Sequence, residues 1–66
     1  MQAHEKLKAW RAAKKLSQLA AAKLIGVSQP TWWDWEQARK TPIVEHRGAI
    51  ARVTRGAVSV AAWGEK

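Results

Sequence analysis

Five side chains that can hydrogen-bond to bases or stack on them recur at helical spacing in the middle of the chain. Residues 29, 33 and 37 are four apart and residues 30 and 34 lie beside them, so in a helix all five share one face. They are Gln29, Pro30, Trp33, Asp34 and Gln37. A Gln amide can pair with N6 and N7 of adenine, an indole can lie against a thymine methyl group, and a carboxylate can accept from cytosine N4. This face therefore predicts contact with base edges in a DNA groove.

The charge of the chain favours a polyanionic partner. Its 66 residues contain 12 Lys and Arg but only 5 Asp and Glu, which gives a net charge of +7 at pH 7. A domain so basic suits double-stranded DNA or an anionic membrane surface. Phosphate contacts are expected from side chains that flank the base-reading face, namely Ser28, Thr31, Arg39, Lys40, Lys14 and Lys15.

Several other classes of function find no support in the residue types. The sequence has no Cys, and His4 and His46 have no clustered carboxylates at metal-ligand spacing, so neither a metal nor another cofactor is expected. Ser17, Ser28 and Ser59 fit helix caps, and no base can be assembled around them, so we expect no enzyme. No apolar run approaches the roughly 18 residues that span a bilayer, and the first residues lack the apolar segment of a signal peptide, which favours a cytoplasmic location.

Gly26, Pro42 and Gly56 divide a sequence that otherwise favours helix. Apolar residues three apart predict a helix over residues 3–15. A second helix begins after the N-cap Ser17, is rich in Ala, and ends at Gly26, because glycine readily adopts the left-handed conformation of a helix cap.

The remaining segments continue the helical pattern. Ser28 is a good N-cap and Pro30 is tolerated in a first turn, while Ile43 begins an apolar stripe that Gly56 can end with a left-handed cap. The expected helices after the second one cover Gln29 to Ala38, residues 43–54 and a last short turn over residues 59–63. We therefore expect a single all-α domain over residues 1–66, compact and built of five short helices.

The second and third helices, joined by Gly26-Val27-Ser28, have the layout of a helix-turn-helix. In this motif the first helix crosses the DNA backbone and the second enters the major groove. Four tryptophans lie on apolar stripes and are expected in the core, namely Trp10, Trp32, Trp35 and Trp63. Trp33 falls about 100° from Trp32 around the third helix and is expected outside the core.

A set of residues between positions 16 and 42 carries a family resemblance. They are Leu16-Ser17-Gln18, Ala22, Gly26-Val27-Ser28-Gln29, Thr31, Trp35-Glu36 and Pro42. With them the chain resembles the Cro/repressor family of helix-turn-helix proteins over residues 7–42, and the residues that follow resemble the end of small prophage Cro-like and antitoxin-like proteins. The resemblance implies that Gln18 contacts a phosphate and braces Gln29, and that Arg11 forms a largely buried pair with Glu36.

The sequence departs from that family at positions 21, 32 and 34. Ala21-Ala22 stands where the family usually has Leu-Ala, and Trp32 stands where it has Ile or Val. In this chain a small residue on the second helix faces a large one on the third helix, whereas the family has a large residue facing a smaller one. We therefore expect the two changes to compensate in volume. Asp34 replaces a basic or amide residue, and its negative charge repels phosphate.

These observations favour a transcriptional repressor of the phage or prophage Cro type that binds operator DNA as a homodimer. Val58, Val60 and Trp63 offer an apolar contact surface for a second copy, or else pack into the core. Two alternatives stay open: an antitoxin or other operon autoregulator with the same fold, and a protein-interaction or inhibitory helical module that does not bind DNA. A membrane-active helix over residues 3–15 would leave the turn Gly26-Val27-Ser28 and the second half of the chain unexplained, so no membrane partner is expected.

Overall fold

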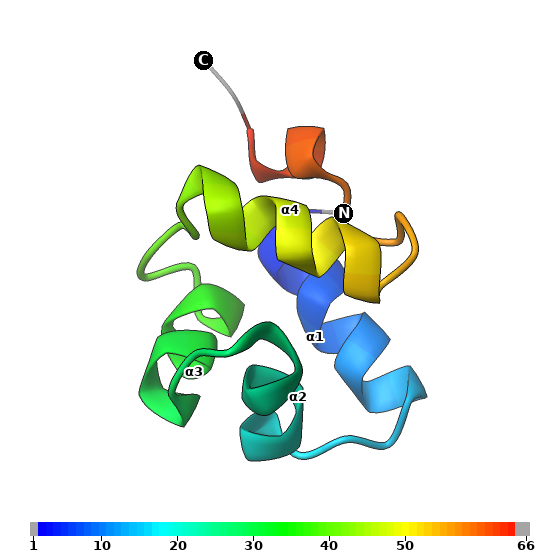
Figure 1. Ribbon diagram of the computed structural model, residues 1–66, viewed down its shortest axis with the longest axis vertical. Helices are drawn as coiled ribbons and strands as arrows, with labels where there is room; N and C mark the ends of the chain where they lie inside the picture. Colours follow the sequence, from blue (N-terminus) through cyan, green and yellow to red (C-terminus); the bar gives the residue numbers. More distant parts are fainter. Residues whose placement is uncertain (1, 65–66) are drawn as a thin grey trace.

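Four α-helices and a short 3-10 turn make up the part of the chain that the computed structural model describes, residues 2–64 (Figure 1). The α-helices are α1 (Ala3–Ala13), α2 (Gln18–Ile25), α3 (Gln29–Glu36) and α4 (Val44–Val53), followed by the 3-10 turn η1 (Val60–Trp63). The all-α prediction is confirmed, but the prediction of five helices is wrong. Ser59 and the left-handed Gly64 enclose only four residues, which suits a 3-10 turn better than an α-helix.

Three helices end earlier than the sequence indicates, because a residue other than glycine adopts a left-handed conformation after the cap. These residues are Lys15, Ala38 and Arg55, with φ of 57°, 60° and 55°. Residues 3–15 and 29–38 were expected to be helical throughout, whereas α1 ends at Ala13 and α3 at Glu36. Gly26 caps α2 with φ 95° as predicted. Gly56 is also left-handed, with φ 83°, but it follows Arg55, which is the first left-handed residue after α4.

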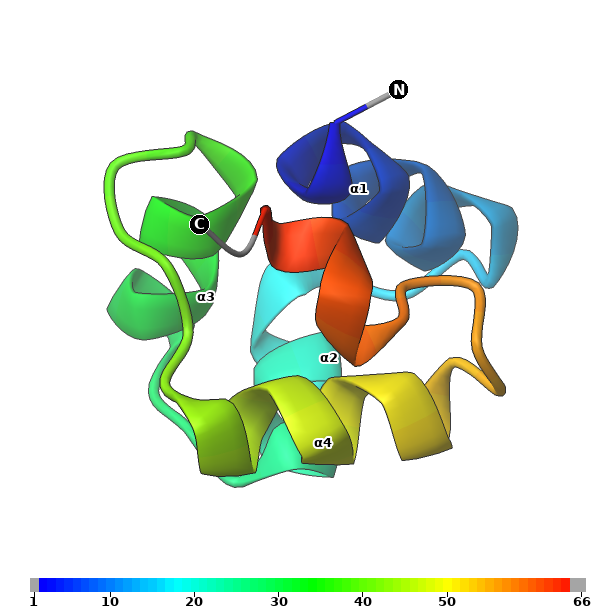
Figure 2. The ribbon, with the colours of Figure 1, turned by 90° about the horizontal axis from the view of Figure 1, so that it is seen from above.

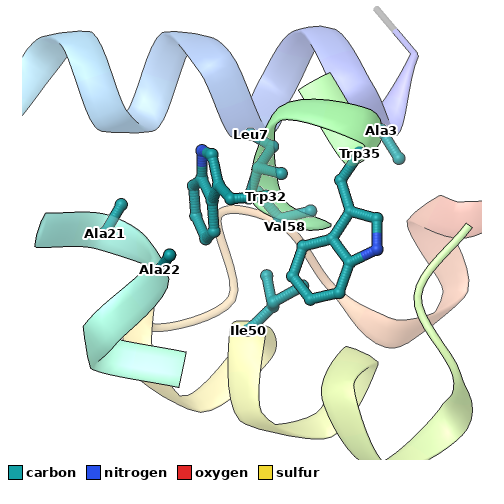
Figure 3. Close-up of a cluster of buried hydrophobic side chains, with 8 residues drawn as sticks. All are labelled: Ala3, Leu7, Ala21, Ala22, Trp32, Trp35, Ile50 and Val58. Carbon is teal, nitrogen blue, oxygen red and sulfur yellow. The ribbon is translucent and has the colours of Figure 1, made fainter. Parts of the chain in front are cut away.

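The core lies where all four helices and η1 meet. Its buried apolar residues are Ala3, Leu7, Ala21, Ala22, Trp32, Trp35, Ile50 and Val58. Figure 3 shows the Trp32 indole between Leu7 and the two alanines of α2, and all four side chains are fully buried. A large side chain on α3 thus fills the space that two small ones on α2 leave.

The core predictions for tryptophan hold in part. Trp32 and Trp35 are buried and their ring centroids lie 5.9 Å apart. Trp10 and Trp63, which were also expected in the core, are half-buried and pack against its edge. Trp63 lines a cavity of about 130 Å³ between the start of α1 and the end of α3.

The C-terminal part of the described chain closes the core opposite α2. Figure 2 shows η1 between α1 and α4, and η1 contacts both helices. Val58 is fully buried, and its backbone N–H donates to the buried Thr54 hydroxyl at 3.2 Å. Val58 is therefore a core residue and cannot belong to a surface for a second copy.

Ile43 was expected on the apolar stripe of the helix over residues 43–54. It is instead the N-cap of α4, and 58% of the residue is exposed.

The carboxylate of Glu36 joins three helices at the edge of this core. Arg11 donates to it from α1 through Nε at 2.5 Å and Nη2 at 3.2 Å. Gln18 Nε2 donates from α2 at 3.2 Å, and Trp32 Nε1 donates from within α3 at 2.5 Å. Because the Glu36 side chain is only 1% exposed, these donors replace the water that it lost on folding.

Burial alone raises the pKa of Glu36, but the hydrogen bonds from Arg11, Trp32 and Gln18 and the charge of Arg11 outweigh it, so the pKa lies below its usual value of 4.5. The folded state therefore favours the ionised form. The stability that this carboxylate contributes is fully present above about pH 4.5 and is lost as the pH falls through the lower, folded-state pKa.

We expect Glu36→Gln to lower the free energy of unfolding at pH 7 by about 3 to 5 kcal/mol, because it leaves Arg11 without its buried counter-charge. The deficit should shrink between pH 7 and pH 3, since protonation removes the same charge from the parent. Urea unfolding followed by tryptophan fluorescence measures both effects. Glu45→Gln, at an exposed carboxylate in the first turn of α4, is the control. Equal stability of the parent and Glu36→Gln at pH 7 would contradict this account.

Two glycine substitutions should act in opposite directions. A Cβ added to Gly26 or to Gly48 meets no atom within 4 Å, but Gly26 has φ +95° whereas Gly48 lies inside α4. Gly48→Ala should therefore stabilise the protein by about 0.5 to 1 kcal/mol. Gly26→Ala should destabilise it by roughly 1 to 2 kcal/mol through backbone strain. Thermal melting of both variants tests this. Shifts of the melting temperature with the same sign would contradict the different backbone roles given to Gly26 and Gly48.

Candidate nucleic-acid interface

The segment from α2 to α3 forms two short helices joined by a tight turn. Ser17 caps α2 by accepting from the Ala20 N–H at 3.0 Å. The left-handed Gly26 then ends α2, and the Ser28 hydroxyl accepts from the Thr31 N–H at 3.4 Å at the start of α3. Each helix is thus begun and ended by local hydrogen bonds. Their mutual angle is fixed by packing at the core, and α3 lies at the outer edge of the molecule in two perpendicular views (Figures 1 and 2).

Helix α3 has an inner and an outer face. Trp32, Trp35 and Glu36 point inward and are buried. The outer residues Gln29, Pro30, Trp33 and Gln37 are exposed, with Trp33 41% exposed. Four side chains of the proposed base-reading set thus lie on one accessible surface.

Asp34, the fifth member of that set, is turned toward the end of the helix. Its carboxylate lies 3.7 Å from Arg39 Nε and 3.9 Å from Lys40 Nζ, and its side chain is only 21% exposed. Arg39 also places its guanidinium carbon 5.6 Å from the centre of the Trp33 ring. These contacts could not be predicted from residue spacing, because they depend on the turn that the chain makes after Glu36 at the left-handed Ala38.

The residues proposed for phosphate contact lie in three places. Arg39 and Lys40 follow α3 directly, and their side chains are 66% and 74% exposed. Lys14 and Lys15 are exposed in the turn between α1 and α2. At the start of α3, the exposed Ser28 and the half-buried Thr31 bring their hydroxyl oxygens within 3.0 Å of each other.

Gln18 stands at the start of α2, half-buried. The family resemblance implied that its amide braces Gln29, whereas the structure turns its nitrogen to Glu36 Oε1. Gln18 therefore supports α3 from the inside of the motif. Gln29 projects from the first turn of α3 without that support.

Sequence reasoning missed one feature near this surface. Ile43 and Val44 are 58% and 69% exposed at the start of α4. Pro42 directly before them predicted a helix start, but nothing in the residue types indicated that these two apolar side chains face away from the core. Arg47 Nε donates back to the Pro42 carbonyl at 2.7 Å and fixes this turn.

The described residues offer neither a metal cluster nor a membrane-spanning helix. Within residues 2–64, no three His or acidic side chains come together in a way that would hold a metal ion. None of the helices in that range has the length and apolar character needed to cross a membrane.

The comparisons with known proteins agree with this geometry. Residues 5–58 match the family model described as a helix-turn-helix domain, a stretch that contains α2, α3 and α4 in full. None of the curated proteins and none of the solved structures matches the chain. The match covers most of the sequence, and within it lie both helices of the motif and the turn between them. This chain belongs to the helix-turn-helix domain family.

Proposed function

We propose that this protein is a transcriptional repressor of the Cro type that binds operator DNA with α3 in the major groove. The observation that carries the proposal is the exposed outer face of α3, which ends beside the exposed cations Arg39 and Lys40 in a chain of net charge +7. In a helix-turn-helix domain, the second helix is the one that enters the groove. Residues 1–66 act as one DNA-binding domain.

Base reading is assigned to the outer face of α3, that is to Gln29, Pro30, Trp33, Asp34 and Gln37. Gln29 lies in the first turn, where a helix enters the groove, and its exposed amide can pair with the N6 and N7 edge of adenine. The Trp33 ring, with Arg39 over it, offers an apolar surface to a thymine methyl group or a sugar.

Backbone anchoring is assigned to residues around that face, namely Gln18, Ser28, Thr31, Arg39, Lys40, Lys14 and Lys15. Lysine and arginine side chains neutralise phosphates, and the hydroxyl groups at the start of α3 can donate to them. Such contacts hold the helix in register without reading sequence.

A homodimer on two half-sites completes the proposal. A single module of this kind buries only about 600 to 1,000 Å² on DNA, so two copies about 34 Å apart are needed for useful affinity. The exposed Val60 and the half-buried Trp63 remain candidates for the contact between copies, since Val58 is taken up by the core.

Replacing both Arg39 and Lys40 by Ala should weaken binding to every duplex by a similar factor. Each lost phosphate contact should also make the slope of log affinity against log salt shallower by about 0.9. Mobility-shift titrations on a random-sequence duplex at several salt concentrations measure the slope. The control is Arg52→Ala with Arg55→Ala, two exposed cations at the far end of α4, which should change the slope less. A parent protein that shows no salt dependence would contradict the DNA-binding proposal.

Gln29→Ala and Trp33→Ala should affect sequence preference in different ways. Gln29→Ala should lose about 1 to 3 kcal/mol on the preferred duplex, lose almost nothing on random DNA, and relax preference at one base pair per half-site. Trp33→Ala should weaken the preferred duplex without altering that base pair, because an indole face cannot offer the paired donor and acceptor of an amide. Selection of binding sites from a random pool compares them. The same consensus from Gln29→Ala as from the parent would mean that Gln29 does not read a base.

A further inference from the structure

Asp34 draws together the two cations that follow α3. Its carboxylate oxygens face Arg39 at 3.7 Å and Lys40 at 3.9 Å, so one negative charge lies against two positive ones. The backbone holds the arrangement, because the Arg39 N–H and the Lys40 N–H both point to the Asp34 carbonyl, at 2.9 Å and 3.5 Å. The backbone at residues 39 and 40 is therefore held close to Asp34, from where both cationic side chains reach its carboxylate.

Arg39 is held from a second side as well. Its guanidinium carbon lies 5.6 Å from the centre of the Trp33 ring, so the group is close to both an indole and a carboxylate. Trp33 and Asp34 are neighbours on α3, and both belong to its outer half. The guanidinium thus lies beside residues of the face of α3 that would meet DNA.

We propose that Asp34 is a specificity-determining residue whose carboxylate competes with DNA phosphates for Arg39 and Lys40. To neutralise phosphates, both cations must leave Asp34, and the carboxylate then faces a polyanion without compensation. That loss occurs on DNA of any sequence, because phosphate contacts do not depend on the bases. A penalty against the wrong partner is one of the two ways in which an interface becomes specific. This inference rests on the proposed function.

A matching duplex compensates Asp34 in another way. In the major groove, cytosine presents its N4 amino group and adenine its N6 amino group, and a carboxylate can accept from either. Where such a group lies opposite Asp34, the cations move to phosphates and the carboxylate gains a donor in exchange. Asp34 therefore lowers binding to arbitrary DNA more than binding to a matching site. Asp34 thus raises the ratio of the affinity for a matching site to the affinity for arbitrary DNA.

The substitution Asp34→Asn tests this, because it removes the charge and keeps the shape of the side chain. Mobility-shift titrations are made on a random-sequence duplex and on the duplex that the parent selects from a random pool. Loss of two exposed ion pairs of this kind changes a binding constant by about 3- to 10-fold in total. We expect Asp34→Asn to bind random DNA more tightly by that factor, with a steeper salt slope. The affinity of Asp34→Asn for the selected duplex should rise less than this or fall, so that the ratio of selected to random affinity falls.

Two controls separate competition from a general effect of charge. Glu45→Gln removes the same charge from an exposed side chain on α4 and should leave the ratio unchanged. In a background in which Arg39 and Lys40 are both replaced by Gln, Asp34→Asn should raise the affinity for random DNA by a smaller factor, no larger than that of Glu45→Gln, since the carboxylate has no cations to withhold and only its general repulsion from phosphates remains. Circular dichroism confirms the helical content of each variant.

The outcomes are distinct. A parent protein that binds neither duplex overturns the proposed function. A parent that binds, with Asp34→Asn raising both affinities by the same factor as Glu45→Gln, overturns the role of Asp34 and leaves DNA binding in place. An Asp34→Asn protein that does not fold is replaced by Asp34→Ala, which should raise random binding in the same way and lose more on the selected duplex. No gain on random DNA from Asp34→Ala would likewise overturn the proposal.

Discussion

A buried carboxylate keeps its charge only where donors surround it, and Glu36 meets this condition by collecting one donor side chain from each of three helices. Arg11 ties α1 to it, Gln18 ties α2, and Trp32 ties it to the preceding turn of α3 itself. The position of α3 is thus set from inside the molecule. Because no exposed residue of α3 takes part in this network, the outer face can carry chemistry that does not serve folding.

The end of α3 is where these two roles meet. Glu36 is its last residue and Gln37 its cap, and the left-handed Ala38 then turns the chain so that Arg39 and Lys40 lie close to Asp34. Asp34 lies one turn before, close enough to hold both cations. The residues that end α3 therefore also determine the position of the positive charge beside the proposed base-reading face.

The sequence predicted those features that follow from helical periodicity and local caps. The two faces of α3 follow from residue spacing, and Ser17, Gly26 and Ser28 mark the ends of α2 and the start of α3 through their own side chains or backbone. Features that depend on the approach of distant segments were not predictable in this way. The residues around position 58 have no clear period, so the sequence could not decide whether Val58 lies in the core or on a contact surface for a second copy. Whether the Gln18 amide contacts Gln29 or Glu36 depends on how α2 packs against α3.

The fit of Trp32 against Ala21 and Ala22 also constrains how this sequence can diverge. Because the indole fills the volume that the alanines leave, a larger residue at position 21 meets the ring and a smaller one at position 32 opens a cavity. Each change alone is unfavourable, whereas both together restore the packing. Trp32 bears a further constraint, since its indole N–H donates to Glu36, and an aliphatic replacement would take a donor from that carboxylate. Drift at these positions is therefore epistatic, and stepwise replacement passes through less stable intermediates.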